Sequence, residues 1–130
     1  DPFNVMVWEN LSGIYQSFIG AAEGANNLAI SHLAQAISLD PTNPKLRLQL
    51  GILYYNLQDK EQAIKLINQA VELKPNWSLP YQNLYRVYLE EKDTERAKIY
   101  LQEVLKYSQN NSDDFQKLQQ ELINLNQNTN

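Results

Sequence analysis

The feature of this sequence that most constrains its fold is a repeat of residue types every 34 positions. The segment LGILYYNLQDKEQAIKLINQAVELKP, residues 50–75, returns in kind 34 residues later. Three columns carry the period with alanine, a large aliphatic residue and a small aliphatic residue: Ala29, Ala63 and Ala97; Leu33, Ile67 and Leu101; and Ala36, Ala70 and Val104. Fixed periods of about 20–50 residues are typical of stacked units that share one continuous core. We therefore expect a repeat protein built from three related units.

Each unit is predicted to contain two helices. Apolar residues recur every three or four positions in the second and third units, which is the spacing of one helix face. The four predicted helices span residues 44–57, 60–73, 78–91 and 94–107. Short polar residues stand where they would accept hydrogen bonds from the first turn of each helix. These expected N-caps are Asn43, Asp59, Ser78 and Asp93.

The first unit departs from this plan because it is longer. Fourteen positions separate Tyr15 from Ala29, whereas nine separate the corresponding Tyr54 and Ala63, so five residues are inserted within residues 18–27. The two glycines of that segment, FIGAAEGANN, suit a turn. We expect a longer first helix, a surface loop and then a second helix. A functional lip beside the binding groove is the alternative.

A last helix is predicted over residues 112–127. Its apolar residues form one stripe: Phe115, Leu118, Leu122 and Leu125. The end unit of a stack leaves an apolar face that needs a cover with a polar outer side. We expect this helix to be that cover, and docking of a partner is its alternative role.

Composition and charge exclude several classes of function. The net charge is −4 and no dense Lys/Arg block occurs, which argues against nucleic acid and against an anionic membrane surface as partners. No apolar run approaches the roughly 20 residues of a membrane span, so we expect no direct membrane insertion by this segment. The chain has no cysteine and one isolated histidine, His32. We therefore predict no catalytic residue, no metal site, no cofactor and no enzymatic activity.

These columns resemble the tetratricopeptide repeat, whose unit favours W-x2-L-G-x2-Y followed by Ala, a large apolar residue, Ala and Pro. The middle unit matches all of these places except the aromatic one, with Leu50, Gly51, Tyr54, Ala63, Ile67, Ala70 and Pro75. The resemblance implies an all-α, right-handed α-solenoid of three helix hairpins plus a C-terminal capping helix. It implies one domain over residues 1–130. The first repeat spans residues 5–43 and contains the insertion 18–27, the second spans 44–77, the third spans 78–111, and the capping helix spans 112–127.

The same resemblance implies a non-catalytic scaffold that binds a partner protein or peptide in a concave groove. Ligand contacts in this family lie on the first helix of each unit, at places that do not face its partner helix. Carried over, they are Met6, Glu9, Gly13, Gln16, Lys45, Leu48, Ile52, Tyr55, Asn56, Leu79, Gln82, Arg86 and Leu89. Tyr55 and Arg86 are the expected anchors, because Tyr and Arg are enriched among binding hot spots. Leu48, Ile52 and Leu89 should form an exposed apolar patch, whereas the alternative interpretation is a solvated face.

One ligand class of the family is disfavoured. Its chaperone-tail clamp holds a peptide carboxylate with a Lys and an Asn of the first repeat. The corresponding places hold Glu9 and Gly13 in this chain. An anionic tail would therefore meet a like charge.

A second resemblance is to tetratricopeptide segments at the carboxyl end of bacterial multi-span envelope proteins of the O-antigen polymerase and ligase type. It is carried by residues 8–15, by GAAEGANN, and by LDPTNP and LKPNW. It implies an accessory tail of a membrane-bound glycan polymerase or ligase, tethered through a part that precedes Asp1. The first residue is not methionine, and we expect a piece of a longer parent. Weak self-association as a structural module is a further alternative.

Overall fold

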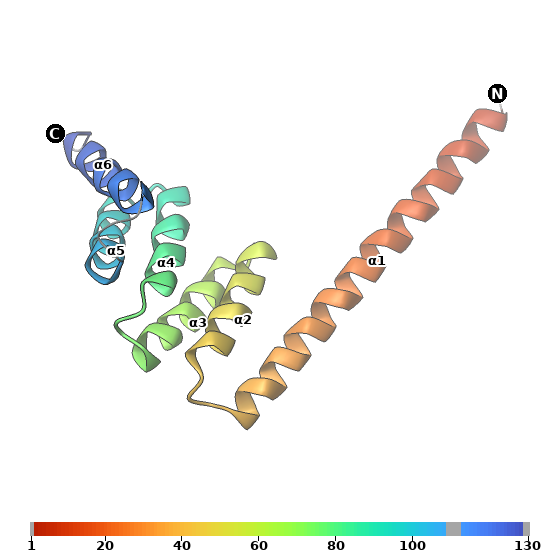
Figure 1. Cartoon of the computed structure of the whole chain (residues 1–130). Helices are drawn as coiled ribbons and strands as arrows, with labels where there is room; N and C mark the ends of the chain where they lie inside the picture. Colours follow the sequence, from red (N-terminus) through yellow and green to blue (C-terminus); the bar gives the residue numbers. More distant parts are fainter. Residues whose placement is uncertain (1, 109–112, 129–130) are drawn as a thin grey trace.

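The computed structural model describes residues 2–108 and 113–128, and in the first helix it describes the side chains of Ile14, Ser17 and residues 20–39. These residues form an all-α helical repeat solenoid with no strand among them (Figure 1). The helices are α1 (Pro2–Leu39), α2 (Pro44–Asn56), α3 (Lys60–Leu73), α4 (Ser78–Glu90), α5 (Thr94–Tyr107) and α6 (Asp113–Gln127). Helices α2 and α3 form one hairpin and α4 and α5 the next, as the sequence predicts. The predicted all-α repeat fold is confirmed.

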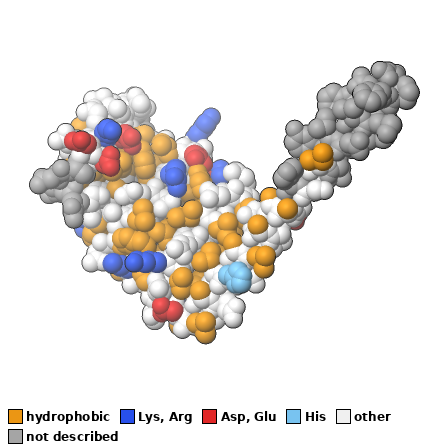
Figure 2. Space-filling model, turned by 45° about the vertical axis from the view of Figure 1, so that its right-hand side comes forward, with side chains coloured by type: hydrophobic (Ala, Val, Ile, Leu, Met, Phe, Trp, Pro, Cys, Tyr) orange, Lys and Arg blue, Asp and Glu red, His pale blue; other side chains and the backbone are white. Residues whose placement is uncertain are grey.

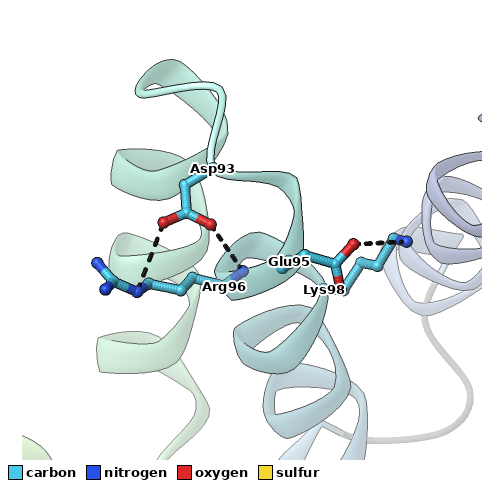
Figure 3. A network of polar contacts seen from close by, with 4 residues as sticks. All are labelled: Asp93, Glu95, Arg96 and Lys98. Atoms are coloured by element: carbon cyan, nitrogen blue, oxygen red, sulfur yellow. Dashed lines mark hydrogen bonds and ion pairs between the residues drawn. The ribbon is translucent and has the colours of Figure 1, made fainter. Parts of the chain in front are cut away.

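Side-chain caps start most of the helices of these two hairpins. Asn43 accepts a hydrogen bond from the backbone N–H of Lys45 at the start of α2. Asp59 and Asp93 cap α3 and α5 in the same way, each with an N–O distance of 3.1 Å. Asp93 also pairs with the Arg96 side chain, so one carboxylate holds both the backbone and a cation (Figure 3). The prediction for α4 is wrong, because its N-cap is Trp77 rather than Ser78 and has no side-chain cap bond.

Small residues set the distance between the paired helices. A methyl group added to Gly51 would lie 2.8 Å from Cγ1 of Ile67 and 3.3 Å from the carbonyl oxygen of Ala63. Gly51 therefore lets α2 and α3 approach closely. The buried core extends from this contact across both hairpins, through Leu48, Ile67, Ala70, Leu84, Tyr88 and Ala97.

The turns inside the two hairpins have the same backbone conformation. Gln58 and Lys92, which are 34 positions apart, have left-handed φ values of 65° and 58°. Each precedes the aspartate that caps the second helix of its hairpin. Lys60 and Glu91 form an ion pair that joins the two hairpins at this edge. The turn geometry thus repeats with the same period as the core.

The first unit does not form the predicted hairpin. Residues 18–27 continue α1 as one unbroken helix, and α1 extends away from the rest of the molecule (Figure 1). The physical reason lies at Ala25, which occupies the column of the capping residues Asp59 and Asp93. Alanine is a poor N-cap and the best helix former, so this column lacks the start signal that Asp59 and Asp93 supply in the other units. Hence the prediction of a surface loop or lip at residues 18–27 is wrong.

Helix α6 packs against α5 at the other end of the stack. Its apolar stripe, with Phe115 and Leu118 on it, is half-buried, and none of its residues is fully buried. The Tyr85 hydroxyl of α4 donates a 2.8 Å hydrogen bond to Oε2 of Glu121 and so ties α6 to the second hairpin. Among the described helices, none combines the length and the apolar character needed to span a bilayer.

Candidate functional site

The concave groove is a surface cavity of about 520 Å³ between α2, α4 and α6. Its apolar lining includes Ile52 from α2, Leu79 and Leu89 from α4, and Leu118 from α6. Leu79 and Leu89 are each 42% exposed, although both are large aliphatic residues. They lie ten positions apart on α4, so the apolar lining runs along most of that helix. Exposed apolar side chains that line one cavity are typical of an interface.

Arg86 provides the positive charge of the groove. Its guanidinium carbon lies 5.3 Å from the centre of the Tyr55 ring, which is the distance of a cation–π contact. Its Nη2 donates a 2.7 Å hydrogen bond to Oδ1 of Asn83, and Asn83 donates in turn to the carbonyl of Leu79. Asn83 is only 7% exposed. The guanidinium is therefore held in one orientation while its outer edge remains accessible to a ligand.

Two tyrosines keep their protons more tightly than usual: Tyr85, which lines the groove, and Tyr55, which lies beside Arg86. Partial burial raises the pKa of Tyr85, and the hydrogen bond to Glu121 raises it further. Partial burial also raises the pKa of Tyr55, helped by a hydrogen bond and by the charge of Glu90. Both phenols are therefore neutral at physiological pH, and they offer aromatic faces rather than negative charge.

The structure places the predicted contact residues unevenly. Ile52, Leu79, Gln82, Arg86 and Leu89 line the groove together, and Tyr55 joins them through Arg86. Lys45 and Asn56 are exposed on α2 but do not line this cavity. The side chains of Met6, Glu9, Gly13 and Gln16 lie outside the described residues.

The prediction for Leu48 is wrong. Leu48 is 3% exposed and packs in the core with Leu84 and Tyr88 of α4. A first helix inside a stack has two buried faces, because it meets its own partner helix and also the first helix of the next unit. Leu48 lies on the second of these faces, so it is not part of an exposed apolar patch.

Sequence reasoning missed the contribution of α6 and of two α4 residues. Leu118 and Glu121 line the groove from α6, and Asn83 and Tyr85 line it from α4. A signal existed for Tyr85, since a large aromatic residue stands there in the column that Gly51 fills in the preceding unit. Its ring extends toward α6, where the hydroxyl meets Glu121.

Candidate metal ligands do not cluster in the part of the chain that the structure describes. No three His, Asp or Glu side chains are grouped there as ligands for a metal ion. The single histidine, His32, is exposed on α1.

Comparisons with known proteins give one family. A tetratricopeptide repeat model matches residues 21–86, and a second tetratricopeptide repeat model matches residues 81–111. No curated protein matches the sequence.

Solved structures of low sequence identity share the fold. The first tetratricopeptide domain of Spaghetti (RPAP3), bound to the HSP90 peptide SRMEEVD, has a TM-score of 0.66 at 23% identity, covering 82% of this chain and 84% of that one. The Sgt2 domain from Aspergillus fumigatus has a TM-score of 0.66 at 20% identity, covering 83% and 70%. MamA has a TM-score of 0.61 at 23% identity, covering 63% of this chain. The match spans about half of the MamA chain, 48%. The repeat columns, the paired helices and the two family models together show that the chain belongs to the tetratricopeptide repeat family.

Proposed function

We propose that this chain is a non-catalytic interaction module that holds an apolar segment of a partner protein in the concave groove. The observation that carries the proposal is the apolar lining of the groove with one oriented cation beside it. Leu79 and Leu89 remain 42% exposed although both are large aliphatic residues. Arg86 is held by Asn83 and by the Tyr55 ring at the same surface.

The chemistry of the groove restricts the partner segment. An apolar side chain fits against Ile52, Leu79 and Leu89, and an aromatic ring or a hydrogen-bond acceptor fits beside Arg86. Glu121 borders the groove and Glu90 lies against Tyr55, so a strongly acidic segment would meet like charges there. The groove therefore favours a mainly apolar segment with one acceptor or aromatic group. Because a single small groove buries little area, we expect transient binding.

The structural neighbours are compatible with this function. The Spaghetti domain is bound to an HSP90 peptide. The family resemblance implies that Glu9 and Gly13 stand at the places where a Lys and an Asn would hold an acidic peptide tail. The proposed partner therefore differs in charge from that acidic peptide.

Selection of displayed peptides tests the proposal. Random peptides are selected on the immobilised chain, and the enriched peptides are then measured by fluorescence polarisation. We expect Leu89→Glu and Arg86→Ala each to weaken binding by roughly 30-fold, as for hot-spot residues. Ile99→Glu is the matched control, because Ile99 is a 56% exposed aliphatic residue on α5. Absence of enriched peptides, or equal binding by the Leu89 and Ile99 variants, would contradict the proposal.

A further inference from the structure

The second helix of the first unit lacks the neighbour that its counterparts have. Ala63 and Ile67 of α3 are at most 1% exposed because α2 covers them. The residues in the same columns of α1, Ala29 and Leu33, are only half-buried. Hydrophobic side chains are visible along the described part of α1 where it leaves the body of the molecule (Figure 2). One side of α1 is therefore uncovered where a first helix would pack.

Helix α2 lacks the same neighbour. Val87 and Tyr88 of α4 are 1% and 9% exposed within the stack. Their counterparts on α2, Leu53 and Tyr54, are half-buried. We call the surface formed by Ala29, Leu33, Leu53 and Tyr54 the open seam. In the second and third units, the corresponding residues of α3 and α4 both pack against a first helix, α2. One helix could therefore cover both sides of the open seam.

The sequence identifies that helix. Leu11, Ser12 and Tyr15 repeat the types of Leu50, Gly51 and Tyr54, apart from serine in place of glycine. In this structure the segment lies on the same straight helix as the seam. Tyr15 and Ala29 are 14 residues apart, which is about 21 Å along a helix axis at roughly 1.5 Å per residue. While α1 is straight, a chain cannot cover its own open seam.

The α1 pattern suits pairing with a second α1. Positions separated by steps of three or four share one helix face. This face contains Leu11, Tyr15, Phe18, Ala22, Ala25, Ala29 and Leu33. Large residues dominate its N-terminal half and alanine its centre. An antiparallel copy aligned like α2 on α3 therefore sets large residues opposite small ones.

Charge does not oppose this pairing. Over Pro2–Leu39 the only Asp, Glu, Lys or Arg residues are Glu9 and Glu23. Neither lies on the shared face. The described residues Ala22 and Ala25 on that face are exposed in the single chain. Burial of these positions against a second copy would bring no charge into the interface.

We propose that two copies of this chain exchange their N-terminal helical segments, so that residues 5–16 of each copy fill the open seam of the other. The exchange uses the contacts that a closed hairpin would make within one chain, which is the usual basis of domain swapping. Gly24 stands in the column of the left-handed residues Gln58 and Lys92, so a turn at this place is the competing arrangement. Ala25 in the capping column favours the straight helix and hence the swapped dimer.

Cysteine pairs distinguish the swapped dimer from the closed hairpin. The chain has no cysteine, so introduced thiols react alone. Ser12→Cys and Ala29→Cys correspond to Gly51 and Ala63, which are in contact in α2 and α3. The two single variants are refolded together and oxidised. We expect a disulfide-linked species of twice 15.1 kDa in the mixture and in neither variant alone.

The controls make each outcome decisive. Ser12→Cys mixed with Ser31→Cys should give no linked dimer, because Ser31 lies on the opposite face of α1 from Ala29. A double Ser12→Cys/Ala29→Cys chain that links only within itself, with no linked species in the mixture, would establish the hairpin and overturn the proposal. A wild-type mass of 15.1 kDa by light scattering at the highest soluble concentration would also overturn it.

A charge on the shared face gives an independent measurement. Ala25→Arg places an unpaired cation in the proposed interface, whereas Ser31→Arg places it on the opposite face. Both residues are exposed in the single chain, so neither change disturbs its core. We expect Ala25→Arg to raise the dimer dissociation constant more than about tenfold and Ser31→Arg to leave it unchanged. Equal effects of the two changes would contradict the proposed pairing.

Discussion

The second and third units of this chain and its first unit carry the same columns of residues, yet they differ in packing. In the second and third units the column residues Ala63, Ile67, Ala97 and Leu101 are almost fully buried. In the first unit the matching residues are half-buried, because α1 is one straight helix. The apolar columns thus specify which surfaces fit together. Whether a hairpin closes within the chain depends on a few turn residues.

The largest expected difference between the units is the loss of unfolding free energy when the same column residue is truncated to alanine. Ile67→Ala removes a side chain that is 1% exposed and leaves a cavity, so we expect a loss of about 2–5 kcal/mol in the free energy of unfolding. Leu33→Ala acts in the same column of the half-covered unit and should cost roughly 1 kcal/mol in dilute solution. Urea denaturation followed by circular dichroism measures both. Equal costs at low protein concentration would show that the first unit is closed.

Replacing a glycine by alanine should change the folding stability in opposite directions in the two regions. Gly51→Ala gains helix propensity of up to about 1 kcal/mol but overpacks the contact with Ile67, at a cost of roughly 1–3 kcal/mol. We expect a net loss of about 1 kcal/mol. At Gly24 an added methyl group meets nothing within 4 Å, so Gly24→Ala should stabilise by about 0.5–1 kcal/mol. Thermal melts of the two variants give the signs, and destabilisation by Gly24→Ala would indicate a left-handed turn at that residue.

The last comparison concerns the covered end of the stack, where α6 packs on the second hairpin. Folding raises the pKa of Tyr85 above its unfolded value of about 10, so the stabilising contribution is complete below pH 10 and falls as the pH rises above it. Tyr85→Phe should cost about 1 kcal/mol at pH 8 through the lost hydrogen bond to Glu121. It should also make the decline in stability between pH 9 and 11 shallower. An unchanged slope would mean that folding does not raise the pKa of Tyr85.

Local sequence patterns were sufficient for the hairpins of the second and third units. The spacing of apolar residues predicted the four helices of these hairpins, and the polar residues before them predicted the caps at Asn43, Asp59 and Asp93. These features depend on residues that are close in sequence or in one repeat. Local chemistry decides them, and the capping aspartates Asp59 and Asp93 recur at the 34-residue period.

The errors concern relations between units and competing local signals. Leu48 was assigned to the groove, but its burial depends on the rotation between successive units, which no single column encodes. In residues 18–27 the glycines favour a turn while Ala25 and its alanine neighbours favour a helix, and the helix prevails. The groove wall formed by Leu118 and Glu121 depends on how α6 packs after the repeats end. The division of the chain into repeat boundaries remains a prediction.

The central position of the core has a mechanical consequence. The buried cluster joins Leu48, Ile67 and Ala70 to Leu84, Tyr88 and Ala97, across the α3–α4 junction. The free energy of local unfolding should therefore be highest in the middle of the chain and decline toward both ends. Helix α1 forms one of these ends. Binding of another molecule to α1 would therefore change the free energy needed to begin unfolding the stack from that end.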